Sequence, residues 1–130
     1  MKRFSTLALI LFLAVSANYL FAQQETKSEG IQIVDAKLGK DIKDRMIADD
    51  NTTFALNSKV FLWLKISGGT NDEITVLWKH GVVAHETRLA IGGSPWRTWA
   101  VKTAYKTGDW SVTVTDKEGK VLKEMNFKVQ

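Results

Sequence analysis

Residues 108–129 constrain the fold most strongly, because they predict a β-hairpin with one apolar and one polar face. In the first arm Trp110, Val112 and Val114 alternate with Ser and Thr, which is the period of a half-buried strand. Asp116 to Gly119 is typical of a turn, with Asp suited to its first position and Gly to its last. The rest of the chain is expected to cover the apolar face of this hairpin. The returning arm carries its apolar residues on one parity: Val121, Met125, Phe127 and Val129.

The register of this hairpin depends on the length of its loop. A three-residue type I turn with a glycine bulge would pair Val112 with Glu124, whereas an even-numbered loop would align the parity of Val112 with that of Met125. A slip of one residue moves every side chain to the other face, so burial of the apolar parity should decide. We predict the even-numbered loop. Leu122 is then the misfit, either partly exposed or accommodated by a bulge.

The first 22 residues have the pattern of a secretory signal peptide. Lys2 and Arg3 precede an apolar run over 7–15, and Ala22 offers a cleavage point before Gln23, with Ala17 as a second one. The alternative is a membrane anchor, but the run is shorter than the ~20 residues that a span needs. We therefore predict a periplasmic or secreted protein with no membrane span after signal removal. Polar residues 23–30 are expected to form a disordered leader, and 31–130 a single domain.

The charge and cysteine content exclude several classes of protein. The net charge is +4, and removal of Lys2 and Arg3 leaves 16 basic and 14 acidic residues, which are interspersed. Such a weak bias, in an exported chain, gives no indication of nucleic-acid binding. The chain has no Cys, so it has neither disulfides nor thiolate metal sites. The predicted domain must be held together by its core.

The rest of the chain predicts further short strands. Residues 31–38 alternate, with a kink expected near Val34, and 59–66 are apolar on both faces, as in a strand covered on two sides. Residues 73–79 and 82–91 form a hairpin around His80-Gly81, and 96–101 follow a break at 92–95. Residues 39–58 are expected to form a long surface connection, pinned by Phe54 and Leu56, although Ile42 and Met46 also have the spacing of one helical turn. About seven strands at such spacing predict an all-β antiparallel sandwich or small barrel.

The segment from Phe61 to Val129 resembles the bacterial domain of unknown function 2914. The resemblance rests on short motifs in this order: 61–63 (Phe-Leu-Trp), 78–81 (Trp-Lys-His-Gly), 97–99 (Arg-Thr-Trp), 108–112 (Gly-Asp-Trp-Ser-Val), 116–122 and 127–129. Asp44-Arg45 resembles a degenerate copy of an acidic-basic loop motif of the family. The family often has a His shortly before its second Trp, and Val76 occupies that position here. The resemblance implies an exported module with an immunoglobulin-like sandwich. It implies no activity.

The chemistry-bearing residues do not predict an enzyme. His80, His85 and Glu86 lie in one hairpin, but a zinc site needs three or four ligands held in geometry, and surface histidines are commoner. The serines lie in no nucleophile-elbow context, and the paired carboxylates of Asp49-Asp50 are typical of a solvated loop. We therefore predict no catalytic residue, no metal and no cofactor.

The five Trp residues are the unusual feature of the composition. Trp63, Trp78 and Trp110 alternate within apolar strands and are predicted core residues. Trp96 and Trp99 fall on opposite faces of their strand, and Trp99 shares its face with Arg97 and Val101.

Three interpretations stay open, two for this Trp-Arg element and one for another strand. Arg97 could pin the long connection by pairing with Asp109 or Asp44. It could instead belong to a sugar-binding face, whose candidate residues are Arg97, Trp99, Lys102, Tyr105 and His80. In the third interpretation the chain is a protein-interaction module, which adds a partner strand to the edge strand over 82–91, where Glu86 and Arg88 limit non-specific pairing. We predict an exported, non-catalytic binding module whose partner is an envelope protein or a glycan. Carbohydrate or peptidoglycan binding is the alternative function.

Overall fold

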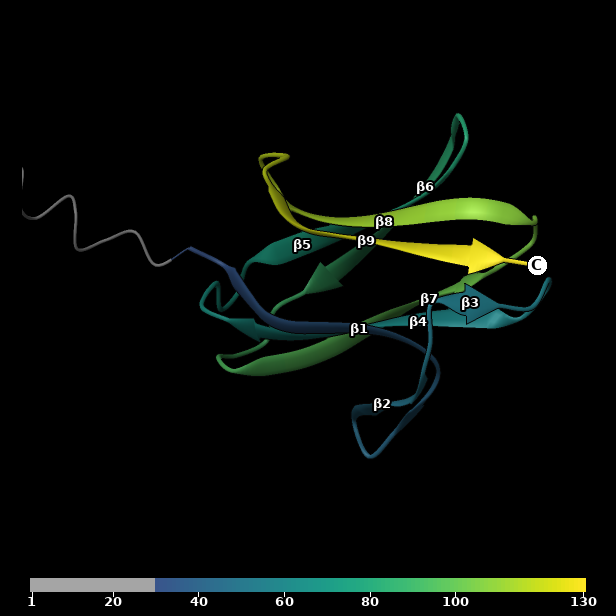
Figure 1. The fold of residues 1–130 in the computed structure, drawn as a ribbon. Helices are drawn as coiled ribbons and strands as arrows, with labels where there is room; N and C mark the ends of the chain where they lie inside the picture. The colour runs from purple at the N-terminus through teal and green to yellow at the C-terminus, as the bar shows by residue number, and fades with distance from the viewer. Residues whose placement is uncertain (1–29) are drawn as a thin grey trace, which may run out of the picture. The chain divides into compact units, whose positions relative to one another are not determined.

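Nine β-strands form two sheets that pack face to face in the computed structural model, which describes residues 30–130 (Figure 1). The predicted signal peptide and residues 23–29 of the predicted leader lie outside the described residues. Within 30–130 there is no helix that could cross a membrane. The strands are β1 (Gln32–Lys43), β2 (Met46–Asp50), β3 (Thr53–Phe54), β4 (Lys59–Ser67), β5 (Glu73–His80), β6 (Val83–Ala90), β7 (Trp96–Thr103), β8 (Gly108–Asp116) and β9 (Val121–Val129).

The strand order confirms the predicted immunoglobulin-like sandwich. The four-stranded sheet has the order β2-β1-β4-β7, and the five-stranded sheet has the order β3-β9-β8-β5-β6. The chain crosses repeatedly between the two sheets, as in immunoglobulin domains. It does so between β4 and β5, between β6 and β7, and between β7 and β8. All pairings are antiparallel except that of β3 with β9. Short strands β2 and β3 account for the difference from the predicted seven.

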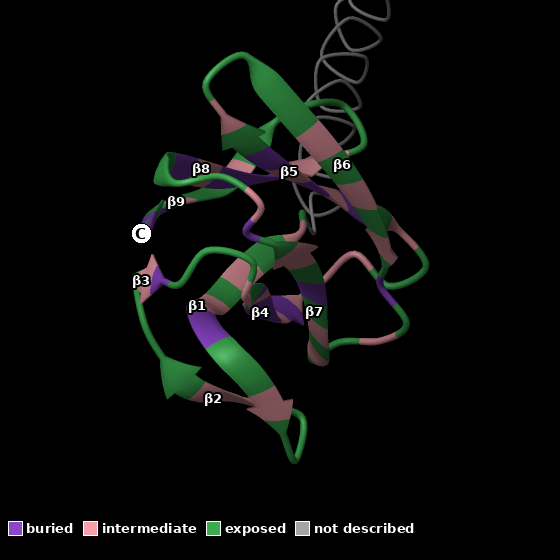
Figure 2. Ribbon diagram, turned by 90° about the vertical axis from the view of Figure 1, so that its right-hand side faces the viewer, coloured by how far each residue is buried: buried purple, intermediate pink, exposed green. Residues whose placement is uncertain are grey.

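The core lies between the two sheets (Figure 2). Strand β4 presents Val60, Leu62, Leu64 and Ile66 to it, and the five-stranded sheet presents Trp78 and Trp110, all of them buried. Phe127 packs against both indoles, edge-on to Trp78 and stacked on Trp110. Because no disulfide is possible, this apolar layer supplies the cohesion of the sandwich.

The β8–β9 hairpin has the predicted parity but not the predicted loop. Val112 pairs with Met125, as expected. The loop itself is the three-residue type: the Gly119 amide donates to the Asp116 carbonyl, and the Asp116 amide donates to the Lys120 carbonyl. The prediction of an even-numbered loop was therefore wrong. A bulge at Leu122 shifts the register between Val114 and Thr115, restores the parity and leaves Leu122 half-buried against the core.

The region 39–58 differs most from expectation, because it is not a surface connection and contains no helical turn. Strand β1 continues to Lys43, a two-residue turn follows, and Lys43 pairs with Met46 as β2 returns. In Figure 1, β2 lies on the side of the four-stranded sheet that faces away from the five-stranded one. Phe54 is buried and anchors this region, as predicted, whereas the side chain of Leu56 is exposed and only its backbone amide is bonded, to the carbonyl of Gln130. The kink predicted near Val34 is confirmed by a register shift between Ile33 and Asp35.

Candidate functional site

The outward-facing surface of the four-stranded sheet carries the predicted Trp-Arg element. In the β4–β7 ladder Trp63 pairs with Trp99, and Lys65 pairs with Arg97, so these four residues form two adjacent cross-strand rows. The buried residues Leu64, Ile66 and Ala100 alternate with them and face the core. Trp99 is 37% exposed and Val101 46% exposed. The predicted shared face of Arg97, Trp99 and Val101 is confirmed.

Trp63 is buried, as predicted, but not between the sheets. It lies on the outer face, opposite Lys37 and Trp99 in the ladders, and is outside the inter-sheet cluster. Its Nε1 donates a hydrogen bond to the carbonyl oxygen of Arg45 over 2.8 Å. The β1–β2 hairpin therefore bends over Trp63 and shields it from solvent.

Gly39 allows this bend in the β1–β2 hairpin. A Cβ at this position would come within 2.8 Å of the Ala48 carbonyl oxygen and would also overlap the side chain of Ile47. Only glycine permits such close contact between the two strands here.

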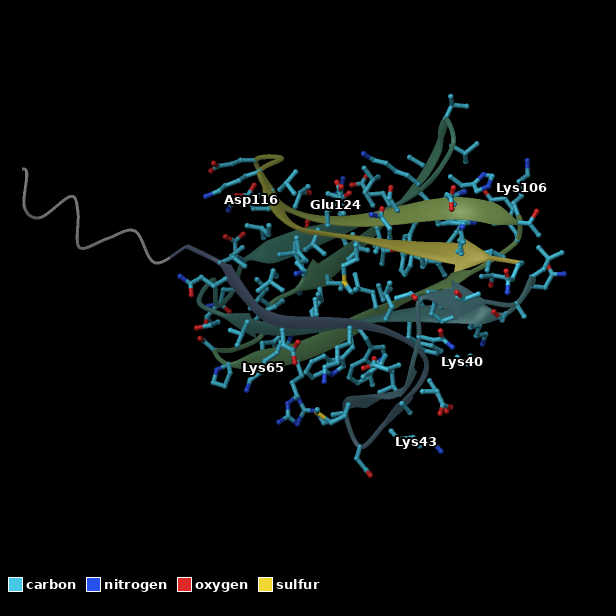
Figure 3. The ribbon with its side chains drawn as sticks, viewed as in Figure 1. Lys40, Lys43, Lys65, Lys106, Asp116 and Glu124 are labelled. Carbon is cyan, nitrogen blue, oxygen red and sulfur yellow. The ribbon has the colours of Figure 1, made fainter. Side chains whose placement is uncertain are left out.

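A basic pocket of about 240 Å³ opens beside these rows and is lined by Arg45, Lys65, Pro95 and Arg97. The hairpin turn brings Arg45, β4 brings Lys65 and β7 brings Arg97. Figure 3 labels Lys65 on the sheet surface that faces away from the five-stranded sheet. Among residues 30–130 the ion pairs involve none of the three cations, so Arg97 does not form the pair with Asp109 or Asp44 that one interpretation considered.

Sequence reasoning missed Arg45 and Lys65 as partners of Arg97. Lys65 and Arg97 meet only through the register of β4 with β7, and Arg45 joins them only because the β1–β2 hairpin bends over the sheet. The one local signal was the Asp44-Arg45 pair, which resembles an acidic-basic loop motif of the family.

The other three predicted site residues lie elsewhere. Lys102 is on the opposite face of β7 from Arg97 and Trp99, and its Nζ lies 5.4 Å from the ring centroid of Tyr105. Tyr105 shares a hydrogen bond of 3.1 Å with His85 and packs edge-on against Trp110. The five predicted residues therefore form two groups, and the structure does not bring them together in one site.

His80 belongs to this second, aromatic group. Its ring lies 5.0 Å from the Trp110 ring, and its Nε2 is 2.9 Å from the Thr107 carbonyl oxygen. Because a carbonyl only accepts, Nε2 donates this hydrogen bond and His80 ties the end of β5 to the loop before β8.

The histidine hairpin does not gather a set of metal ligands. Successive residues of a strand point to opposite faces, so Glu86 points away from His85, and it pairs with Arg88 at 3.2 Å. In the described part of the chain no group of three or more His, Cys, Asp or Glu is placed to hold a metal ion.

A larger hollow of about 440 Å³ lies where β3 meets the β8–β9 hairpin. Trp110 and Phe127 form its apolar wall, and Asp109 and Lys128 are its charged lining residues. Trp110 and Phe127 are themselves buried core residues, and opposite charges line the hollow. It therefore has neither an exposed aromatic ring nor a single sign of charge to attract a ligand.

The comparison with known families finds a match over the part of the chain that includes Arg97 and Trp99. Residues 71–129 match the family described as Protein of unknown function (DUF2914). This is the family that the sequence resembles. The DUF2914 match runs from the turn before β5 to the end of β9, so it includes Arg97 and Trp99 but neither Arg45 nor Lys65. No curated protein matches the chain. The DUF2914 description carries no activity, so the function has to be argued from the site.

Proposed function

We propose that this chain is an exported, non-catalytic binding module of the bacterial envelope, and that it binds a glycan through the outer face of β7. The observation that carries this proposal is the exposed indole of Trp99, which lies next to Arg97 along one edge strand. The other Trp residues are buried or half-buried, so Trp99 is the indole most available to a ligand.

The chemistry of a saccharide fits this surface. The C–H face of a sugar ring packs against an indole, while a guanidinium donates several hydrogen bonds to hydroxyl or carboxylate oxygens. The β4–β7 ladder fixes the backbone of Trp99 opposite that of Trp63, whose indole is itself held by the hydrogen bond to Arg45. A rigid platform loses little conformational entropy when it binds.

A glycan array and a pull-down on insoluble peptidoglycan test the proposal. We expect wild-type binding, and we expect Trp99→Ala and Arg97→Ala each to weaken it by about tenfold or more, as for other central contact residues. The control is Val83→Ala, an exposed strand residue on the other sheet, which should bind like the wild type. Variants that fold normally and keep wild-type binding at both positions would contradict this assignment of the face.

A second candidate function is strand addition at β6, with an envelope protein as the partner. β6 is an edge of the five-stranded sheet; Val82 in the turn before it is completely exposed, and Val83 at its start is 40% exposed. An extended partner segment would pair with this edge. A photo-cross-linking residue at Ala84 should then capture the partner, whereas one at Trp99 should not. Capture at Trp99 alone would favour the outer face of β7 instead.

Export can be tested separately from binding. Cleavage after Ala22 would leave Gln23 as the first residue of protein recovered from the periplasm or the medium. N-terminal sequencing that finds Met1 on membrane-bound protein would support the anchor alternative and contradict the proposed secretion.

A further inference from the structure

The basic pocket beside Trp99 has a composition that points to an anion. Three of its four lining residues are cations, Arg45, Lys65 and Arg97, and the fourth is Pro95. We propose that this pocket binds a phosphate group carried by a sugar, the sugar ring lying on Trp99. This inference rests on the proposed glycan-binding face and names the class of glycan.

No carboxylate is among the residues that line the pocket. Asp35 lies in the same cross-strand row as Lys65 and Arg97, but on the far side of Lys65. Its Oδ2 is 3.8 Å from Lys37 Nζ, and its Oδ1 accepts a hydrogen bond from the Ala36 amide. Asp35 and Lys37 therefore largely offset each other. Three converging cations match a phosphate dianion better than a single carboxylate, and two guanidinium groups can each bind it with two hydrogen bonds.

The backbone of Arg45 is an independent indication that its side chain has a role. Asp44 and Arg45 are the two turn residues of the β1–β2 hairpin, and both have positive φ, 52° and 61°. A turn of this kind favours Gly at its second position, because a side chain in the left-handed region is strained. A strained non-glycine residue that points its cationic side chain into a pocket is typical of a functional position.

The spacing along β7 fits a phosphorylated sugar. Arg97 and Trp99 are two residues apart on one face of a strand, a separation of about 6.7 Å. A sugar ring attached to a phosphate in the basic pocket can therefore reach the Trp99 indole without crossing other elements. The ligand class is a sugar phosphomonoester, and neutral sugars lack the group that the cations would bind.

Titration calorimetry of the purified protein with four probes tests the ligand class. The probes are glucose 6-phosphate, inorganic phosphate, glucuronate and glucose. We expect glucose 6-phosphate to bind at least about tenfold more tightly than glucuronate or glucose, and to bind more weakly as salt is raised, because the attraction is between charges. Equal affinity for glucuronate and glucose 6-phosphate, or no binding of either phosphate at low salt, would overturn the proposal.

Single-charge variants test the site. Arg97→Gln and Lys65→Gln should each weaken glucose 6-phosphate binding by about tenfold or more, since each removes a charge-assisted contact. The matched control is Lys79→Gln, which removes an exposed strand lysine from the other sheet and should change binding less than about twofold. An equal loss of affinity in Lys79→Gln would show that the ligand is attracted by the net charge of the protein alone, and would overturn the assignment of the site to this pocket.

Arg45→Gly separates binding from folding. Glycine suits the left-handed turn position, so the unfolding temperature should not fall, yet glucose 6-phosphate binding should weaken by about tenfold. A stable variant with unchanged binding would remove Arg45 from the site.

Trp99→Ala distinguishes failure of this inference from failure of the proposed function. If this variant lowers the affinity for glucose 6-phosphate to that for inorganic phosphate, the proposed function and this inference both stand. If glycans bind and need Trp99, but phosphate and the three cations have no effect, the proposed function stands and this inference fails. If phosphate binding needs the cations but Trp99→Ala binds glucose 6-phosphate like the wild type, the anion pocket stands while the saccharide assignment and the proposed function fail.

Discussion

The indole Nε1 of Trp63 donates to the carbonyl oxygen of Arg45 over 2.8 Å, and this bond joins the middle of β4 to the tip of the β1–β2 hairpin. It buries an indole on what would otherwise be the solvent face of a sheet, and it fixes the turn that presents the Arg45 guanidinium. The same contact therefore stabilises the fold and positions one wall of the basic pocket.

Trp63→Phe should weaken the fold and the pocket together. Loss of this hydrogen bond should lower the free energy of unfolding by about 1–2 kcal/mol. The Arg45 turn is then held less firmly, so glucose 6-phosphate should bind more weakly. Urea unfolding and calorimetry measure the two effects.

Trp78→Phe is the matched control for this prediction. Trp78 is also buried, but its Nε1 has no hydrogen-bond partner among residues 30–130. This variant should change stability without changing anion affinity. Equal loss of affinity in both variants would indicate a general loosening of the sandwich rather than a specific contact.

Gly39→Ala should push β2 away from β1. The new methyl group would meet the Ala48 carbonyl oxygen at 2.8 Å, and backbone cannot yield as a flexible side chain can. We expect a loss of about 1–3 kcal/mol in the free energy of unfolding. Gly30→Ala is the control, because a Cβ there has no atom within 4 Å, and it should leave stability unchanged. A neutral Gly39→Ala would contradict the close approach of β2.

Trp99 should provide most of the fluorescence that acrylamide can quench. It is 37% exposed, whereas Trp63, Trp78 and Trp110 are each at most 2% exposed and Trp96 is half-buried against the core. Trp99→Phe should therefore remove most of the quenchable emission and change the free energy of unfolding by less than about 1 kcal/mol. Trp110→Phe should leave the quenchable fraction as it is. Unchanged quenching in Trp99→Phe would mean that this indole is covered in solution.

Asp72 should contribute to the pH dependence of stability. Its Oδ1 accepts a hydrogen bond from the Glu73 amide at 2.8 Å and lies 3.4 Å from Lys117 Nζ; these contacts, the amide first, lower the pKa of Asp72 below its ordinary value of 3.8. The charged carboxylate therefore favours the folded state. This contribution is present above the unfolded-state pKa and is lost as the pH falls through the lower folded-state pKa.

Asp72→Asn measures this contribution, because the amide oxygen can still accept from Glu73 while the charge is gone. The stability difference between wild type and variant should be largest near neutral pH and should shrink as the pH falls below 3.8. Thermal unfolding followed across this range checks it. A difference that grows toward acid pH would contradict the sign.

The sequence predicted those features that depend on local alternation. The parity of Val112 with Met125 and the shared face of Arg97 and Trp99 both follow from period-two patterns. The kink at Val34 was visible as a change of parity. The loop of the β8–β9 hairpin was mispredicted because two bulges offset each other: the glycine bulge in the turn changes the parity, and the one at Leu122 restores it.

The features that the sequence did not predict depend on distant pairing. The β1–β2 hairpin lacks the Asn-Gly or Asp-Gly turn that normally announces a two-residue loop, since Asp44-Arg45 takes its place. Lys65 and Arg97 are neighbours only across the β4–β7 ladder. The basic pocket therefore had no signature along the chain, and only Arg97 was predicted as a site residue.

The most direct measurement is an NMR titration of the isotopically labelled protein with glucose 6-phosphate. We expect shifts of the Trp99 indole N–H and of the backbone amides of Lys65 and Arg97, and none at Asp109 or Lys128 in the hollow beside β3. Shifts confined to Asp109 and Lys128, or no shift at any of these five residues, would contradict the assignment of the binding face.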